Sequence, residues 1–273
     1  MKRNLPKIII FILLAILAIS MILPLIFLFL TTFKSKPEYA MDMFSLPTEI
    51  SFANYVTVLK SFDFVKMTIN SIIVSGGSVT LSILVTSMAG YSLGKLDFSG
   101  KKIVTVLFLL GMFMPGQVLL LPVYNILIKL NLVDKFTGLI LFNAATSIPF
   151  TVMMIMANLK GVQNEILEAA RIDGAGVFKS YFHIVLPLLK PTLATVGMLN
   201  FIGYWNELLY SLIILQDPSK RTVTLSIVSL SNAYQSNTPL LYAGLLLSAG
   251  PVIIFYLIMQ KQMIKGVTGG AVK

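Results

Sequence analysis

Long runs of apolar residues constrain this chain more than any other feature of its sequence. The first run covers residues 8–30 and is interrupted only by Ser20 and Pro24. Because an α-helix rises ~1.5 Å per residue, about 20 apolar residues are enough to cross the hydrocarbon core of a bilayer. The other runs are residues 67–93, 103–128, 138–159, 193–215 and 240–259. The sequence therefore predicts an all-α, polytopic membrane protein with six transmembrane helices.

Composition supports this fold class. The chain is 56% hydrophobic and 12% charged, whereas soluble domains carry about 25% charged residues. The first run exceeds the apolar core of a cleavable signal sequence, which has about 7–15 residues, so we expect it to remain as a span. We expect residues 1–273 to form a single transmembrane domain.

The distribution of basic residues predicts the orientation. If the N-terminus lies inside, the inner segments hold 13 of the 21 Lys and Arg residues and the outer segments hold eight. Cytoplasmic loops near a membrane carry the excess of basic residues, so both termini are expected in the cytoplasm. The formal charge of +10 is dispersed over the span ends and forms no single stripe, which argues against nucleic acid as a partner.

The segment of residues 160–192 is too polar to cross a membrane and has the pattern of a helix-turn-helix. Asn164 is a candidate N-cap of the first helix, and Gly174 has the position of a left-handed C-cap. A second helix is expected over residues 177–185 and is expected to end at Pro187. The pattern predicts a helical pair at the cytoplasmic surface.

The first of these helices has two predicted faces. Ile166, Ala169 and Ala170 would form a narrow face of small and apolar groups. Arg171 follows Glu168 by three residues and would pair with it on the exposed side.

The spacing of this loop resembles a known family. Glu168-Ala169-Ala170, then Gly174, then Ile184-Val185-Leu186-Pro187 is similar to the EAA loop of binding-protein-dependent ABC importer permeases. Further similar stretches are Met114-Pro115-Gly116-Gln117, Trp205-Asn206-Glu207 and the ending from Lys265-Gly266 to Gly269-Gly270-Ala271-Val272. The resemblance is strongest to the carbohydrate-uptake branch, in its MalG-like half.

The resemblance implies a MetI-like permease fold in a bacterial or archaeal plasma membrane, and the import of a sugar or an oligosaccharide. It implies that residues 160–192 couple the chain to an ATPase. The coupling residues carried over are Glu168, Ala169, Ala170, Asp173, Gly174, Ile184, Leu186 and Pro187. The implied partners are a companion permease, a dimer of ATP-binding cassette ATPases, an extracellular or periplasmic solute-binding protein, the sugar and the lipid bilayer.

We expect no cofactor on this chain, with ATP and Mg hydrolysed by the partner subunit. The nearest approach to a phosphate loop, residues 94–102, has the wrong glycine spacing and lacks Ser or Thr after the lysine. His183 is the only histidine, so no histidine-based metal site or catalytic triad can be assembled from this chain alone. The chain is therefore expected to be a transport subunit without catalytic or metal-binding residues.

An ion-coupled secondary transporter is the alternative function. Such proteins usually carry several carboxylates within their spans, whereas Glu207 is the only one within a predicted span here. An intramembrane enzyme would need a catalytic set at membrane depth, and the sequence offers none.

The fifth predicted span carries a candidate solute path. Its polar residues follow i, i+4, i+7, i+11 spacing and would share one helical face: Asn200, Tyr204, Glu207 and Ser211. These groups either line the path of a hydroxyl-rich solute or hydrogen-bond to the companion permease. The sequence leaves both roles, and the identity of the solute, open.

Overall fold

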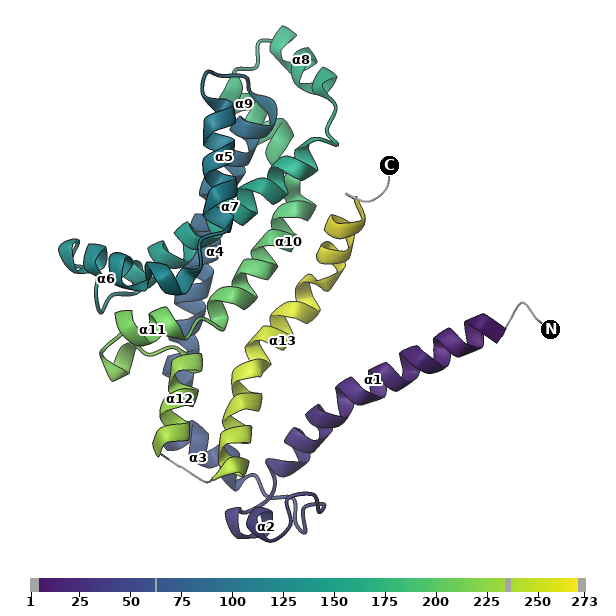
Figure 1. The fold of residues 1–273 in the computed structure, drawn as a ribbon, viewed down its shortest axis with the longest axis vertical. Helices are drawn as coiled ribbons and strands as arrows, with labels where there is room; N and C mark the ends of the chain where they lie inside the picture. Colours follow the sequence, from purple (N-terminus) through teal and green to yellow (C-terminus); the bar gives the residue numbers. More distant parts are fainter. Residues whose placement is uncertain (1–4, 62, 234–236, 270–273) are drawn as a thin grey trace. The chain divides into compact units, whose positions relative to one another are not determined.

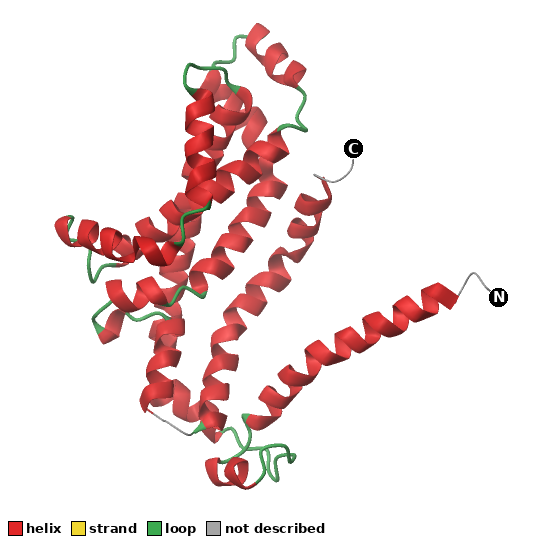
Figure 2. Cartoon of the chain, viewed as in Figure 1, coloured by secondary structure: helices red, strands yellow, loops and turns green. Residues whose placement is uncertain are grey.

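The computed structural model describes residues 5–61, 63–233 and 237–269. Within these ranges every regular element is helical (Figure 2). Five of the described helices are long and apolar enough to cross a membrane, and a sixth span is completed if two helices joined by a sharp bend are counted together. The predicted all-α class is confirmed.

The chain divides into two compact units. The first comprises Met1–Val65 and Ser226–Gly250, and the second comprises Lys66–Leu225 and Pro251–Lys273. The expectation of one membrane domain over the whole chain stays a prediction.

The first unit begins with α1 (Leu5–Thr31), whose most apolar window is entirely unburied within the chain. It continues with α2 (Lys36–Met41) and α3 (Ala53–Ser61). Parts of α12 (Val223–Ala233) and α13 (Thr238–Gly269) complete it. An unburied helix of this length and composition must be covered by lipid or by another protein, because exposed apolar surface is unfavourable in water.

The second unit contains most of α4 (Phe64–Lys95) and the remaining helices. These are α5 (Lys101–Met112), α6 (Leu120–Lys129), α7 (Phe136–Leu159), α8 (Asn164–Ile172), α9 (Val177–Ser180), α10 (Leu186–Trp205) and α11 (Leu209–Ile214). Within this unit α4, α7 and α10 run side by side, and α8 and α9 lie at one end of them (Figure 1).

Two glycines set the distance between α4 and α7. A Cβ on Gly90 would lie 2.5 Å from Ile155 Cγ2, and a Cβ on Gly94 would lie 3.2 Å from Leu159 Cδ1. A side chain at Gly90 would therefore force the two helices apart. Glycines spaced by four residues allow this close packing of membrane helices.

The structure corrects the third predicted span, residues 103–128. Its helix ends at Met112, and a second segment from Gly116 to Lys129 continues at an angle of 99°. The break lies at Pro115, which has no N–H to donate and disfavours helical geometry in the residue before it. Apolar composition alone does not predict this break in the helix.

The fifth predicted span, residues 193–215, is displaced toward the N-terminus. One helical run of 29 residues extends from Val177 to Trp205, and the chain leaves the helix at Asn206. Glu207 therefore lies in the break between α10 and α11 and not on the face of a continuous span. The predicted i, i+7 and i, i+11 relations are wrong, because they assume a helix that runs through residue 211.

Candidate functional site: the coupling loop and the polar core

The turn after α8 is closed by Gly174, which has a φ of +78°. The Gly174 N–H donates to the Arg171 carbonyl at 3.0 Å, and the Ala175 N–H donates to the Ala170 carbonyl at 2.8 Å. This is the Schellman arrangement, in which the last carbonyls of a helix are satisfied by a left-handed residue. The left-handed C-cap predicted at Gly174 is confirmed.

The start of α8 differs from the prediction. Gln163, not Asn164, is the N-cap residue, and its side chain makes no capping bond. Lys95 at the end of α4 instead donates to Asn164 Oδ1 at 2.7 Å and to the Val162 carbonyl at 2.6 Å. The loop is thereby attached to the bundle by a lysine from another helix, which the local sequence does not reveal.

The buried face of α8 consists of Leu167 and Ala170, which are 4% and 8% exposed. Leu167 belongs to an apolar cluster with Tyr91, Ile155, Leu159, Tyr181, Val185, Leu189 and Leu193. Ile166 and Ala169 are exposed, so the predicted face of residues 166, 169 and 170 is corrected to residues 167 and 170. The expected pair of Glu168 and Arg171 is not among the ion pairs of the described residues.

The second helix of the loop does not end at Pro187. From α9 the chain passes through a π-helical turn, Tyr181–Val185, directly into α10. Pro187 follows this π-helical turn inside one helical run from Val177 to Trp205, and a local π-helical adjustment accommodates a proline within a helix. The Tyr181 hydroxyl bonds Ser87 Oγ of α4 at 2.7 Å, so the loop and the spans form one hydrogen-bonded body.

The predicted coupling residues therefore divide into two groups. Ala170 is buried and Leu186 and Ile184 are partly buried against the apolar cluster. Exposed positions are Glu168, Ala169, Asp173, Gly174 and Pro187. They are accompanied by exposed apolar side chains, with Ile172 and Phe178 at 87% and 70%. An exposed surface that combines carboxylates with large apolar groups has the chemistry of a protein-docking site.

A buried polar cluster connects α4, α7 and α10. Asn200 Nδ2 of α10 donates to Ser82 Oγ of α4 and to Thr151 Oγ1 of α7, both at 3.2 Å. One turn further, the Tyr204 hydroxyl donates to Ser147 Oγ at 2.6 Å. Asn200 and Tyr204 are 8% and 9% exposed. Two of the four candidate path residues therefore form hydrogen bonds within their own chain. The sequence did not indicate these partners.

The other two candidates lie at the break after α10. Glu207 Oε1 accepts the Tyr210 N–H at 2.8 Å at the start of α11. Ser211 is 1% exposed, and its Oγ donates to the Glu207 carbonyl at 2.8 Å. Asn206 is exposed and Glu207 is half-buried. The break thus presents an amide and a carboxylate beside a capped helix start.

Comparison with known families decides the assignment. The family described as "Binding-protein-dependent transport system inner membrane component" matches residues 83–268. The chain belongs to this family. The match covers the coupling loop, the break after Trp205 and every member of the polar cluster except Ser82.

Curated relatives extend the similarity over almost the whole permease. The probable ABC transporter permease YurM of Bacillus subtilis is 33% identical over 93% of this chain and 85% of the relative. The melibiose, raffinose and stachyose import permease MelC of the same organism is 32% identical over 95% and 94%. A bacterial ABC transporter that imports alginate has the same fold, with a TM-score of 0.81, 24% identity and coverage of 95% and 97%. The permease is thus a multi-pass inner-membrane subunit of an ABC importer with a MetI-like fold.

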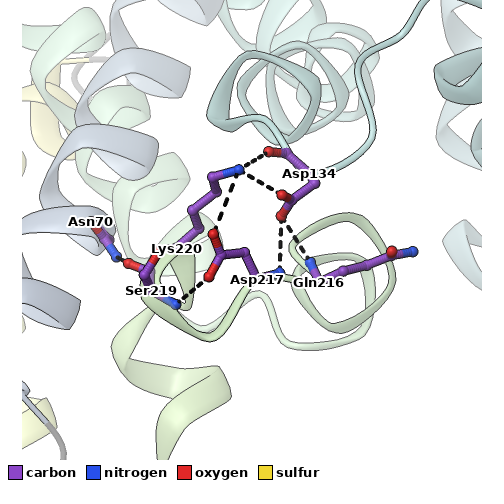
Figure 3. Close-up of polar contacts among 6 residues, drawn as sticks. All are labelled: Asn70, Asp134, Gln216, Asp217, Ser219 and Lys220. Carbon is purple, nitrogen blue, oxygen red and sulfur yellow. Dashed lines mark hydrogen bonds and ion pairs between the residues drawn. The ribbon is translucent and has the colours of Figure 1, made fainter.

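At the other end of the second unit, a cluster of ionic and polar groups ties the permease's loops together (Figure 3). Lys220 Nζ donates to Asp134 Oδ2 at 2.5 Å and to the Asp134 carbonyl at 2.8 Å. The other Asp134 carboxylate oxygen accepts the N–H groups of Gln216 and Asp217 at 3.2 and 3.0 Å. These bonds join the loop before α7 to the loop after α11.

The charges of this cluster are stabilised in their ionised forms. The hydrogen bond from Lys220 and those from the Asp217 and Gln216 backbones hold the pKa of Asp134 below its ordinary value. The Ser219 N–H and hydroxyl lower the pKa of Asp217 in the same way. Asn70 of α4 donates to the carbonyls of Ser219 and Arg221, both at 3.0 Å. The cluster was missed in the sequence because its members are up to 151 positions apart.

Proposed function

We propose that the permease imports a sugar or an oligosaccharide. Relatives named for arabinooligosaccharides, the AraQ permeases of Halalkalibacterium halodurans and Bacillus subtilis, are each 31% identical to the chain. MelC, named for melibiose, raffinose and stachyose, supports the same class. The ion-coupled alternative gains no support from any of these relatives.

The observation that carries the coupling role is the anchored loop of residues 160–192. Lys95, Leu167 and Tyr181 attach this loop to α4 and to the apolar cluster, while Glu168, Ala169 and Asp173 remain exposed. A rigid attachment on one face and a free surface on the other suit an element that transmits displacement from a partner. We propose that this partner is an ATPase dimer. The dimer, and not the permease, binds and hydrolyses ATP with Mg.

The remaining partners follow from the family. A solute-binding protein delivers the sugar from outside, and a companion permease completes the path across the membrane. The distribution of basic residues supports both termini in the cytoplasm, together with residues 160–192.

Within this chain we assign the solute path to the break after α10. Exposed Asn206 and half-buried Glu207 offer hydrogen-bonding groups that suit sugar hydroxyls. Asn200, Tyr204 and Ser211 support the break from inside. In this arrangement their contribution to the path is to hold α10 and α11 in position.

The transport test is ATP-driven uptake by the complete complex in vesicles, with a panel of sugars and with the solute-binding protein present or absent. Uptake of at least one sugar that requires both ATP and the binding protein is expected. Uptake driven by an ion gradient without ATP would contradict the proposal.

The path test compares Glu207→Gln with Tyr204→Phe, with complex yield measured beside uptake. Glu207→Gln should lower sugar uptake while the yield is unchanged, because the neutral amide is a weaker partner for sugar hydroxyls than the carboxylate. Tyr204→Phe should lower stability first. If the uptake of both variants only follows complex yield, the path role of Glu207 is wrong.

A further inference from the structure

The segment that follows α1 exposes an unusual number of large apolar side chains for a loop outside a span. Met41, Phe44, Leu46 and Ile50 are 88%, 77%, 71% and 74% exposed. Side chains of this kind, concentrated within ten residues, indicate a surface that is covered in the working protein.

The position of this surface relative to α1 is defined by an aromatic contact. The ring centroids of Phe44 and Phe27 are 5.5 Å apart. Phe27 precedes the end of α1 at Thr31 by four residues, which corresponds to ~6 Å along the helix axis. Phe44 therefore lies at the level of the last turn of a membrane-spanning helix, where the bilayer interface is expected.

More aromatic rings gather at the same level. Phe33 packs edge-on against Phe29 at 5.1 Å and against Phe52 at 5.4 Å, and Tyr55 lies 6.0 Å from Phe33. The Tyr55 hydroxyl bonds Thr32 Oγ1 at 2.8 Å. Aromatic side chains with one polar end are enriched at the boundary between membrane and water.

A buried lysine fixes the turn that carries Phe44. Lys34 is 1% exposed, and its Nζ donates to the carbonyls of Asp42 and Met43 at 3.0 and 3.1 Å and to Ser45 Oγ at 3.1 Å. The Phe44 N–H donates in turn to Asp42 Oδ1 at 2.9 Å. The ammonium thus holds the backbone of residues 42–45 and leaves the Phe44 side chain pointing outward.

We propose that residues 41–50 form an interfacial membrane anchor, with Phe44 and Leu46 inserted among the acyl chains at the Thr31 end of α1. The occupant of the exposed apolar surface is lipid. Its level at the end of α1, beside Phe27 and beside aromatic rings with a polar end of the kind enriched at the membrane–water boundary, favours lipid over a protein partner. Lys34 acts as the positioning residue that keeps the inserted side chains at this depth.

The test uses single cysteines, because the chain contains none. Phe44→Cys and Leu46→Cys are labelled with an environment-sensitive nitrobenzoxadiazole dye in the complete transporter, in phosphatidylcholine vesicles. Both labels should show blue-shifted emission, loss of fluorescence with acyl-chain nitroxide lipids and protection from iodide. A label at exposed Lys60, outside residues 41–50, is the control, and iodide should quench it.

Iodide quenching at positions 44 and 46, without quenching by the nitroxide lipids, would overturn the anchor. Protection that depends on added solute-binding protein would also overturn it and would assign the surface to that protein.

In the Phe44→Cys background, Lys34→Met should reduce lipid quenching at position 44. A label at Leu25, an exposed position within α1, should stay lipid-quenched and show that the span remains inserted. Unchanged quenching at position 44 would remove the positioning role of Lys34.

Discussion

At the scale of single residues, Gly174 shows how one backbone angle determines the shape of the coupling loop. Its φ of +78° costs a residue with a Cβ roughly 1–2 kcal/mol, and more for a β-branched one. We expect Gly174→Val to abolish uptake and solute-stimulated ATP hydrolysis while the complex still assembles. Gly176→Ala is the matched control, because Gly176 has a φ of −68° and a Cβ added there would meet no atom within 4 Å. Normal ATP coupling in the Gly174 variant would show that the turn does not transmit the ATPase signal.

Asp134 is the residue whose charge should be visible in the pH dependence of stability. Its folded-state pKa is lowered, chiefly by the bond from Lys220, so it stabilises the fold above its unfolded pKa of about 3.9. That contribution is lost as pH falls through the lower folded pKa. Asp134→Asn should therefore lower the unfolding temperature at pH 7. Between pH 5 and pH 3, the unfolding temperature of this variant should fall by less than that of the unaltered permease. The profile of Asp134→Asn is compared with that of the unaltered permease, and identical pH profiles would contradict this assignment.

At the scale of elements, α10 is held against α7 and α4 by hydrogen bonds between side chains. Such bonds in membrane proteins contribute about 0.6 kcal/mol on average. A double-mutant cycle of Tyr204→Phe and Ser147→Ala should therefore show a coupling energy of that order in detergent unfolding. A control cycle uses Ser92→Ala in place of Ser147→Ala. It should be additive, because the Ser92 hydroxyl bonds the Met88 carbonyl of its own helix. Additivity in both cycles would mean that the Tyr204 bond does not stabilise the bundle.

At the scale of the whole molecule, the orientation of the chain can be tested through α7. This helix has 24 residues, or ~36 Å, and its ends adjoin the Asp134 cluster and the coupling loop. The two must therefore lie on opposite sides of the membrane. Cysteines introduced at exposed Lys179 and Ser219 should react with impermeant maleimide from the cytoplasmic and the outer side respectively, and labelling of both from one side would refute this topology.

The sequence by itself determined the features that depend on local chemistry. Apolar length predicted the membrane class because a bilayer accepts only segments that bury their backbone polar groups. The spacing around Glu168 and Gly174 indicated both the family and the left-handed turn. Helix ends were harder to predict from the sequence, since Pro115 interrupts one predicted span and Pro187 is accommodated within another helix.

Only the tertiary structure decided which polar groups meet. Asn200 is satisfied by Ser82 and Thr151, and Asp134 is satisfied by Lys220, from distant parts of the chain. No local pattern encodes these pairs, because each residue gives the same helical or loop signal whatever lies opposite it. A buried polar group without a partner is costly in a membrane protein, and the packing of α4, α7 and α10 selects the partners that Asn200 and Tyr204 find.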